Sequence, residues 1–184
     1  VGPANPAADP IGRLAQRRIT DALRAPDPVS DLLERVSHYS PGDTDLTWTR
    51  LTPWRSLLAS AMDQPCGWVT SASVTAESHY PSAELLAAWL SDRLDVPVSR
   101  ETSHGPGLTE VRLTTDQGDI TISRVDGRVA TLSRFGQPDQ TVALSRRAAS
   151  GALAEELRRL DPDEIYESAA RHLEPLLSGS GARG

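Results

Sequence analysis

Apolar and polar residues alternate along four short stretches between Gly107 and Leu144, which is typical of β-strands with one buried face. The apolar members of these stretches are Val111 and Leu113, Ile120 and Ile122, Ala130 and Leu132, and Val142 and Leu144. Turn-forming residues separate the stretches, and Thr, Ser and Arg occupy the alternate positions. The pattern predicts an antiparallel meander whose apolar face must be covered by helices.

The lengths of the loops follow from the requirement that apolar residues on neighbouring strands share a face, because a slip of one residue reverses every side chain. The sequence favours a loop at Thr115–Gly118, a three-residue loop at Val125–Gly127 and a longer loop at Phe135–Gln140. The predicted cross-strand pairs are Leu113 with Ile120, Val111 with Ile122, Ile122 with Ala130, and Ile120 with Leu132.

Helical spacing dominates the residues before the meander. Asp9-Pro10 and Asp27-Pro28 each combine a capping carboxylate with a proline suited to the first helical position. The apolar positions of the two predicted helices are Ile11, Leu14, Ala15, Ile19, Ala22 and Leu23 for the first, and Val29, Leu32, Leu33 and Val36 for the second. After a loop at Ser40–Asp45, Pro53 divides the next helical pattern into a short turn and a helix capped by Thr52. The predicted buried face of that helix is Trp54, Leu57, Leu58 and Ala61.

A strand, a helix and a second strand are predicted at Trp68–Thr75, Pro81–Leu94 and Val96–Thr102. This order implies a parallel pair of strands, and Pro97 favours a strand start or an edge position for the second one.

Two helices are predicted after the meander. The first ends near Leu160 and buries Ala149, Leu153, Leu157 and Leu160. The second begins at Asp161-Pro162-Asp163-Glu164, where capping explains the acidic residues better than cation binding does. Its predicted inward residues are Ile165, Ala169, Leu173 and Leu176.

The predicted fold class is therefore α+β, a mainly antiparallel sheet covered by helices. We expect a linker remnant at residues 1–8, a helical segment at 9–64, a sheet domain with C-terminal helices at 65–177 and a flexible tail at 178–184. The linker-like start indicates a fragment of a longer protein.

Composition narrows the functional classes. The net charge is −6 and the 19 basic residues, all arginine, are scattered, which argues against nucleic-acid binding. No apolar run approaches the roughly 20 residues that span a bilayer, and Cys66 is the only cysteine, so we expect a cytoplasmic protein without an intrachain disulfide. The four histidines lack the short spacings of zinc sites, and no motif indicates a nucleophile or a phosphate loop. We expect no catalytic residues, no metal and no cofactor.

Tryptophans and arginines are the remaining candidates for binding. Trp54 and Trp89 lie on apolar helix faces, whereas Trp48 and Trp68 fall near loops and suit either a core or an interface. On the meander, Arg124, Arg128 and Arg134 form a candidate anion-binding group, although a solvated sheet face is the favoured explanation for them.

Several segments of the chain resemble the OpcA proteins, which are named as assembly proteins of glucose-6-phosphate dehydrogenase. The resembling segments are DPIGRLAQRRITDA (9–22), PGDTDLTWTRLTPWRSLLA (41–59), PSAELLAAWL (81–90), GRVATLSRFGQPDQTVAL (127–144) and LAEELRRLDPDEIY (153–166). They occur in the family's order, and family members are longer, with an additional N-terminal half. The loop at 66–80 and the region 99–107 follow the family pattern loosely.

The resemblance implies a non-enzymatic protein that binds glucose-6-phosphate dehydrogenase and promotes its active assembly, or activates it allosterically, in the oxidative pentose phosphate pathway. It supplies no catalytic residues. The candidate partner surface comprises Trp48, Arg50, Arg55, Arg146, Arg147, Arg158 and Arg159. The alternative is a sensor domain that binds a sugar phosphate or a nucleotide through Arg124, Arg128 and Arg134.

Overall fold

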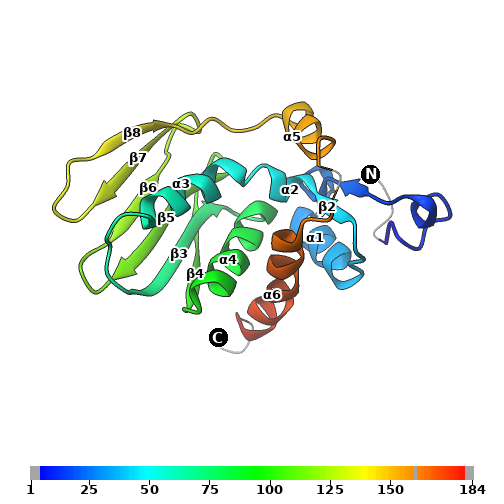
Figure 1. Cartoon of the computed structure of the whole chain (residues 1–184), viewed down its shortest axis with the longest axis horizontal. Coiled ribbons are helices and arrows are strands. Elements are labelled where there is room, and N and C mark those ends of the chain that lie inside the picture. The colour runs from blue at the N-terminus through cyan, green and yellow to red at the C-terminus, as the bar shows by residue number, and fades with distance from the viewer. Residues whose placement is uncertain (1–4, 160, 181–184) are drawn as a thin grey trace.

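The computed structural model describes residues 5–159 and 161–180, with side chains up to residue 173. It confirms the α+β class, because one large sheet packs against helices (Figure 1). The N-terminal elements are the 3₁₀ turns η1 (Gly12–Leu14) and η2 (Ala22–Arg24), strands β1 (Arg18–Thr20) and β2 (Asp43–Asp45), and helices α1 (Pro28–Ser37), α2 (Leu46–Thr49) and α3 (Thr52–Met62). The later elements are β3 (Val69–Glu77), α4 (Pro81–Leu94), β4 (Val98–Ser103), β5 (Leu108–Thr115), β6 (Ile120–Ser123), β7 (Val129–Arg134), β8 (Gln140–Ala143), α5 (Ala149–Glu156) and α6 (Glu164–Ser180).

The large sheet has the strand order β4-β3-β5-β6-β7-β8. Strands β3 and β4 pair in parallel across helix α4, as predicted, and every other neighbouring pair is antiparallel. The edge position of β4 suits Pro97, which has no amide hydrogen to donate and precedes the strand.

The first hairpin of the meander has the predicted register, with Leu113 opposite Ile120 and Val111 opposite Ile122. The predicted register of the second hairpin is wrong by two residues, because Ile122 pairs with Leu132 and Ile120 with Arg134. A shift of two keeps the apolar side chains on one face, so the hydrophobic pattern does not distinguish the two registers.

The second hairpin loop is longer than predicted because its residues have partners of their own. The amide of Arg124 donates to Thr109 O at 2.7 Å, which continues the hydrogen bonding between β6 and β5 by one residue beyond Ser123. Within the loop, Asp126 Oδ1 accepts from the amides of Arg128 and Val129 at 2.8 and 2.9 Å. This side-chain turn replaces the tighter glycine turn that the sequence suggested.

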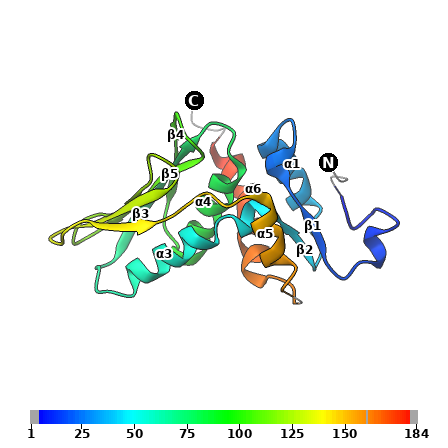
Figure 2. The ribbon, with the colours of Figure 1, turned by 90° about the horizontal axis from the view of Figure 1, so that it is seen from above.

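Helices α3 and α4 lie on the same side of the large sheet (Figures 1 and 2). The predicted division at Pro53 is confirmed, and of the predicted face of α3 the residues Trp54, Leu58 and Ala61 are buried. They join the alternating apolar residues of β3, β5, β6 and β7 in one continuous core. The apolar face of the meander is therefore covered by helices, as its pattern requires.

The predicted cap at Asp9 is confirmed, since Asp9 Oδ1 accepts from the amides of Ile11 and Gly12 at 2.9 and 3.2 Å, but the predicted first helix is wrong. Ile11 and Leu14, which belonged to its apolar stripe, are 81% and 87% exposed. Only the turn η1 forms, and the chain then extends into β1, which pairs in parallel with β2. The ion pair between Arg18 and Asp43 connects these two strands. Contacts with residues far along the chain thus prevail over helical spacing here.

Asp45 explains why the N-terminal segment closes on α2. Its carboxylate is completely buried and accepts from the amides of Ala22 and Thr47 and from the hydroxyls of Thr20 and Thr47, at 2.6–3.2 Å. It caps α2 and fixes the start of η2 at the same time. The second predicted helix is confirmed as α1, with Asp27 accepting from the Ser30 amide at 3.2 Å.

The predicted buried face of α5 is wrong. Leu153 and Leu157 are 39% and 64% exposed, whereas Ala152 and Glu156 point inward and are buried. Leu160 lies outside the described residues. The last helix has the predicted cap, because Asp163 Oδ1 accepts from the amides of Ile165 and Tyr166 at 3.1 and 2.9 Å.

Ala169 and Leu173 of α6 are buried as predicted, while Ile165 is 39% exposed and the side chain of Leu176 lies outside the description. Helix α6 reaches Ser180, within the range expected to be a tail. No helix among residues 5–159 and 161–180 combines the length and the apolar character that a bilayer span requires.

The orientation of α5 can be tested with two leucine-to-alanine substitutions. We expect Leu173→Ala to lower the free energy of unfolding by about 2–5 kcal/mol, because it opens a cavity in the core. Leu157→Ala removes an exposed side chain and is expected to change it by less than about 0.5 kcal/mol. Chemical denaturation of both variants provides the measurement, and equal losses would contradict the outward orientation of Leu157.

Candidate functional site

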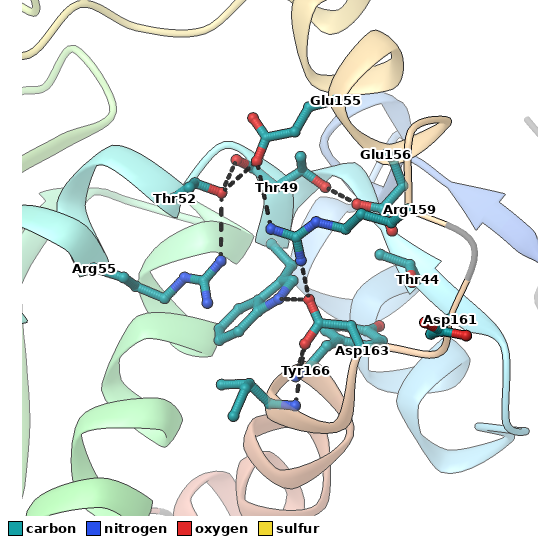
Figure 3. A network of polar contacts seen from close by, with 12 residues as sticks. Thr44, Thr49, Thr52, Arg55, Glu155, Glu156, Arg159, Asp161, Asp163 and Tyr166 are labelled. Carbon is teal, nitrogen blue, oxygen red and sulfur yellow. Dashed lines mark hydrogen bonds and ion pairs between the residues drawn. The ribbon is translucent and has the colours of Figure 1, made fainter.

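A network of polar contacts connects α2 and α3 with α5 and the start of α6 (Figure 3). It assembles side chains from parts of the chain separated by more than 100 residues. Thr49 Oγ1 donates to Glu156 Oε2 at 2.9 Å, and Thr52 Oγ1 donates to Glu155 Oε1 at 3.1 Å. The two adjacent glutamates of α5 therefore both face the α2–α3 region.

Glu156 is the most deeply buried acid of this network, at 1% exposure. Its charge is balanced by Arg17, which forms an ion pair with Glu156 and also donates to Thr44 Oγ1 at 3.1 Å. Arg17 further donates to the main-chain oxygen of Asp161. A buried carboxylate needs both a counter-charge and hydrogen-bond donors, and Arg17 and Thr49 supply them.

Asp163 joins the cap of α6 to the aromatic core. Besides capping α6, its carboxylate accepts from Trp48 Nε1 at 3.0 Å and from Arg159 at 2.8 Å. The Trp48 ring contacts Tyr166 with ring centroids 5.9 Å apart. The position of α6 is thus set by an indole donor and an aromatic contact together.

Arg55 lies over the face of Trp48, with its guanidinium carbon 3.7 Å from the ring centroid. Its only hydrogen bond to a described residue is a long one, 3.4 Å, to Thr52 Oγ1. Burial lowers the pKa of Arg55 to about 10, because the charged form loses hydration with few partners to replace it.

The structure separates the predicted partner-surface residues into three groups. Trp48 is completely buried and Arg55 is stacked on it, so these two residues belong to the packing beneath the predicted partner surface and not to the surface itself. Arg158 and Arg159 are exposed at the α5–α6 turn. Arg50, Arg146 and Arg147 line a separate cavity beside α3.

The three meander arginines do not come together. Arg124 is buried and donates to the main-chain oxygens of Leu144 and Leu108, at 2.9 Å each. Arg128 is exposed, and Arg134 donates to Gln64 at 2.7 Å. Arg124 instead lines the cavity that also contains Arg50, Arg146 and Arg147.

Sequence reasoning missed the roles of Arg17 and Glu156. The one sequence signal for a buried Glu156 is the pair Glu155-Glu156 in an otherwise apolar helix. The helical spacing of the leucines predicts a different inward face. Trp68, whose place in the sequence suits either a core or an interface, is 82% exposed.

Among the described residues, no three His, Cys, Asp or Glu side chains are grouped so that they could hold a metal ion. Apart from the Nε atoms of Arg17 and Arg55, the polar groups of the network are paired with one another, so the arrangement is suited to fixing helices and presenting a surface.

The buried ion pair can be tested with Glu156→Ala. We expect this substitution to lower the free energy of unfolding by about 3 kcal/mol or more, because Arg17 would keep its charge without a partner. Glu110→Ala is the matched control, since it removes one partner of an exposed ion pair with Arg112 and is expected to cost less than about 1 kcal/mol. Urea denaturation measures both, and similar losses would contradict the role of Glu156.

The tyrosines near this network predict a pH dependence. Burial and Glu167 raise the pKa of Tyr39 to about 12 from its ordinary value of 10, and burial raises the pKa of Tyr166 well above that value. A phenol with a raised pKa contributes stability that is present below pH 10 and is lost as the pH rises toward 12. We expect Tyr39→Phe to remove a tyrosinate absorbance transition near pH 12 and to weaken the alkaline loss of stability. A Tyr39 transition at the ordinary pKa in the folded protein would contradict this expectation.

Comparison with known proteins gives both a family and a fold. The family described as the C-terminal domain of a glucose-6-phosphate dehydrogenase subunit matches residues 41–170. A protein from Synechocystis sp., named as a putative OxPP cycle protein OpcA, is 31% identical over 102 residues, which cover 50% of this chain and 21% of that protein. This chain thus aligns with about a fifth of the length of that relative.

Two crystal structures of KijD10, a 3-ketoreductase from Actinomadura kijaniata with bound NADP and TDP-benzene, share the fold. Each superposes with a TM-score of 0.53 and 9% identity, covering 91% of this chain and 72% or 71% of the ketoreductase chain. At this identity the likeness concerns the fold alone. The family match extends over well more than half of the chain. This chain therefore belongs to the OpcA family and corresponds to the family's C-terminal domain.

Proposed function

We propose that this chain is a non-enzymatic interaction protein that binds glucose-6-phosphate dehydrogenase and promotes its active assembly or activates it allosterically in the oxidative pentose phosphate pathway. The family description and the name of the Synechocystis relative support the partner and the pathway. The observation that carries the proposal is an exposed apolar surface on α5 and the start of α6.

The α5 surface, as we call it, consists of Leu153 and Leu157, exposed by 39% and 64%; Ile165, in the first turn of α6, is 39% exposed. Leu153 and Leu157 lie one helical turn apart on the same side of α5. Arg158 and Ile165 line a broad, shallow hollow of about 580 Å³ at the adjoining turn. Exposed large apolar side chains next to arginine are typical of protein interfaces.

The α5 surface is held in place from behind. Glu156 points inward to Arg17, Arg147 pairs with Glu155, and Arg159 pairs with Asp163. These contacts fix the helix before any partner arrives, so binding costs little ordering of the backbone.

An effect on the dehydrogenase requires that this surface bind one state of the enzyme more tightly than the other. A partner that binds an active oligomer or conformation preferentially shifts the population toward it by that difference in affinity. No chemistry by the chain itself is needed.

The test is binding and steady-state activity of the dehydrogenase from the same genome, with and without the chain. We expect co-elution in gel filtration and higher activity in the presence of the chain. The double variant Leu153→Ser/Leu157→Ser is expected to weaken binding about tenfold or more, because each buried leucine contributes roughly 1.5–3 kcal/mol.

A matched control is Val125→Ser/Val129→Ser, which removes two exposed apolar side chains at the meander and is expected to bind as the parent does. If the parent chain neither co-elutes nor changes the activity, the proposed function fails. If it binds and the leucine variant binds equally well, the dehydrogenase contacts another surface.

A further inference from the structure

A small cavity lies between α3, the start of β5 and the connection from β8 to α5. It has a volume of about 40 Å³, is partly open to solvent and is lined by four arginines together with Tyr80 and Ser82. The volume is about three times the roughly 10–15 Å³ in which one water molecule fits. The cavity therefore admits a group of about three polar atoms.

The charges around this cavity are only partly balanced. Arg50 forms a bidentate pair with Asp21, at 2.7 and 2.8 Å, and Arg147 is paired with Glu155. Arg124 and Arg146 have no carboxylate within 4.0 Å among the described residues. Two guanidinium charges thus remain without a counter-charge at one small cavity.

Arg124 is the buried member of this unbalanced pair, at 3% exposure. Its terminal nitrogens donate to two main-chain oxygens, and it lies 4.9 Å from the Trp54 ring centroid. Its Nε has no acceptor in the described part of the chain. Burial lowers the pKa of Arg124, and the neighbouring charge of Arg146 lowers it further. A buried cation with an unused donor is costly unless an anion binds beside it.

Arg146, which lines the cavity, lies beside two glycines and is held by one of them. The amide of Arg146 donates to Gly127 O at 3.2 Å. Gly107 and Gly127 have positive φ angles of 65° and 73°, and a Cβ on either would lie 3.5 or 3.3 Å from Arg146 side-chain atoms. The Cβ on Gly107 would also lie 3.1 Å from the Tyr80 ring. The side chains of Arg146 and Tyr80 therefore both lie next to Gly107, where no Cβ is present.

We infer that this cavity binds the phosphate group of a small phosphorylated metabolite, with Arg124 and Arg146 as the charged ligands and the Tyr80 hydroxyl as a further donor. A phosphate monoester carries nearly two negative charges and three acceptor oxygens, which match the two unbalanced guanidinium groups and the size of the cavity. The rest of the metabolite lies outside, because the cavity has no space for a sugar ring. The inference is independent of the proposed function, since it needs no dehydrogenase.

The test is calorimetric titration and thermal denaturation of the 184-residue chain at low salt, with glucose 6-phosphate and inorganic phosphate as probes and glucose and acetate as controls. We expect both phosphate probes to release heat and to raise the melting temperature, and the controls to do neither. Arg146→Ala is expected to weaken phosphate binding about tenfold or more, as for a lost hydrogen bond to a charged group.

Two further variants separate binding from folding. Tyr80→Phe keeps the ring in the core and is expected to weaken binding severalfold. Arg128→Ala removes an exposed arginine from the β6–β7 loop, which also contains Arg124, and is expected to leave binding unchanged. The inference is overturned if neither phosphate probe binds, if Arg146→Ala binds like the parent, or if acetate competes as well as phosphate. Binding of inorganic phosphate without glucose 6-phosphate would also overturn it, because the ligand would then be the free ion.

Discussion

The buried carboxylate of Glu156 determines how α5 packs against the N-terminal part of the chain. It lies on α5, its counter-ion Arg17 precedes β1, and its second partner Thr49 lies on α2. A charge buried at this depth is tolerated only with all of these partners in place, so three distant segments are held in one arrangement. The orientation of α5 follows from this requirement: Ala152 and Glu156 face inward, and Leu153 and Leu157, each one residue further on and so about 100° around the helix, are partly exposed.

Arginine performs several distinct tasks in a chain that contains no lysine. Arg17, Arg18 and Arg50 neutralise buried or half-buried carboxylates, and Arg55 covers the face of Trp48. Guanidinium suits these positions because its planar donors reach several acceptors at once and its face stacks on aromatic rings. Like Arg55, Arg124 and Arg146 have no ion pair with a carboxylate among the described residues: Arg124 donates to main-chain oxygens and Arg146 is exposed. A protein with a net charge of −6 has ample acids to pair with them, which makes their isolation at one cavity informative.

Local patterns predicted most of the elements correctly, and the failures have a common origin. The meander, the crossover through α4 and the caps at Asp27 and Asp163 depend on neighbours in sequence. The candidate sites were less predictable, because Arg124 was grouped with the other arginines of its strands but lies with Arg50, Arg146 and Arg147. No spacing along the chain predicts that grouping, because the arginines that line the cavity come from separate loops and helices that meet only in the folded protein.

By itself the sequence determined the fold class, the faces of the strands and the first hairpin register, since alternation and turn residues act over a few positions. Only the tertiary structure decided that residues 18–20 form a strand, that the second hairpin is two residues longer and that α5 buries a glutamate. In the first and the last of these cases a polar group pairs with a residue far along the chain, Arg18 with Asp43 and Glu156 with Arg17, whereas the hairpin loop is held by the local contacts of Asp126. The energy of satisfying such a group exceeds the weak preference of a local apolar pattern, and that energy is not visible until the chain has folded.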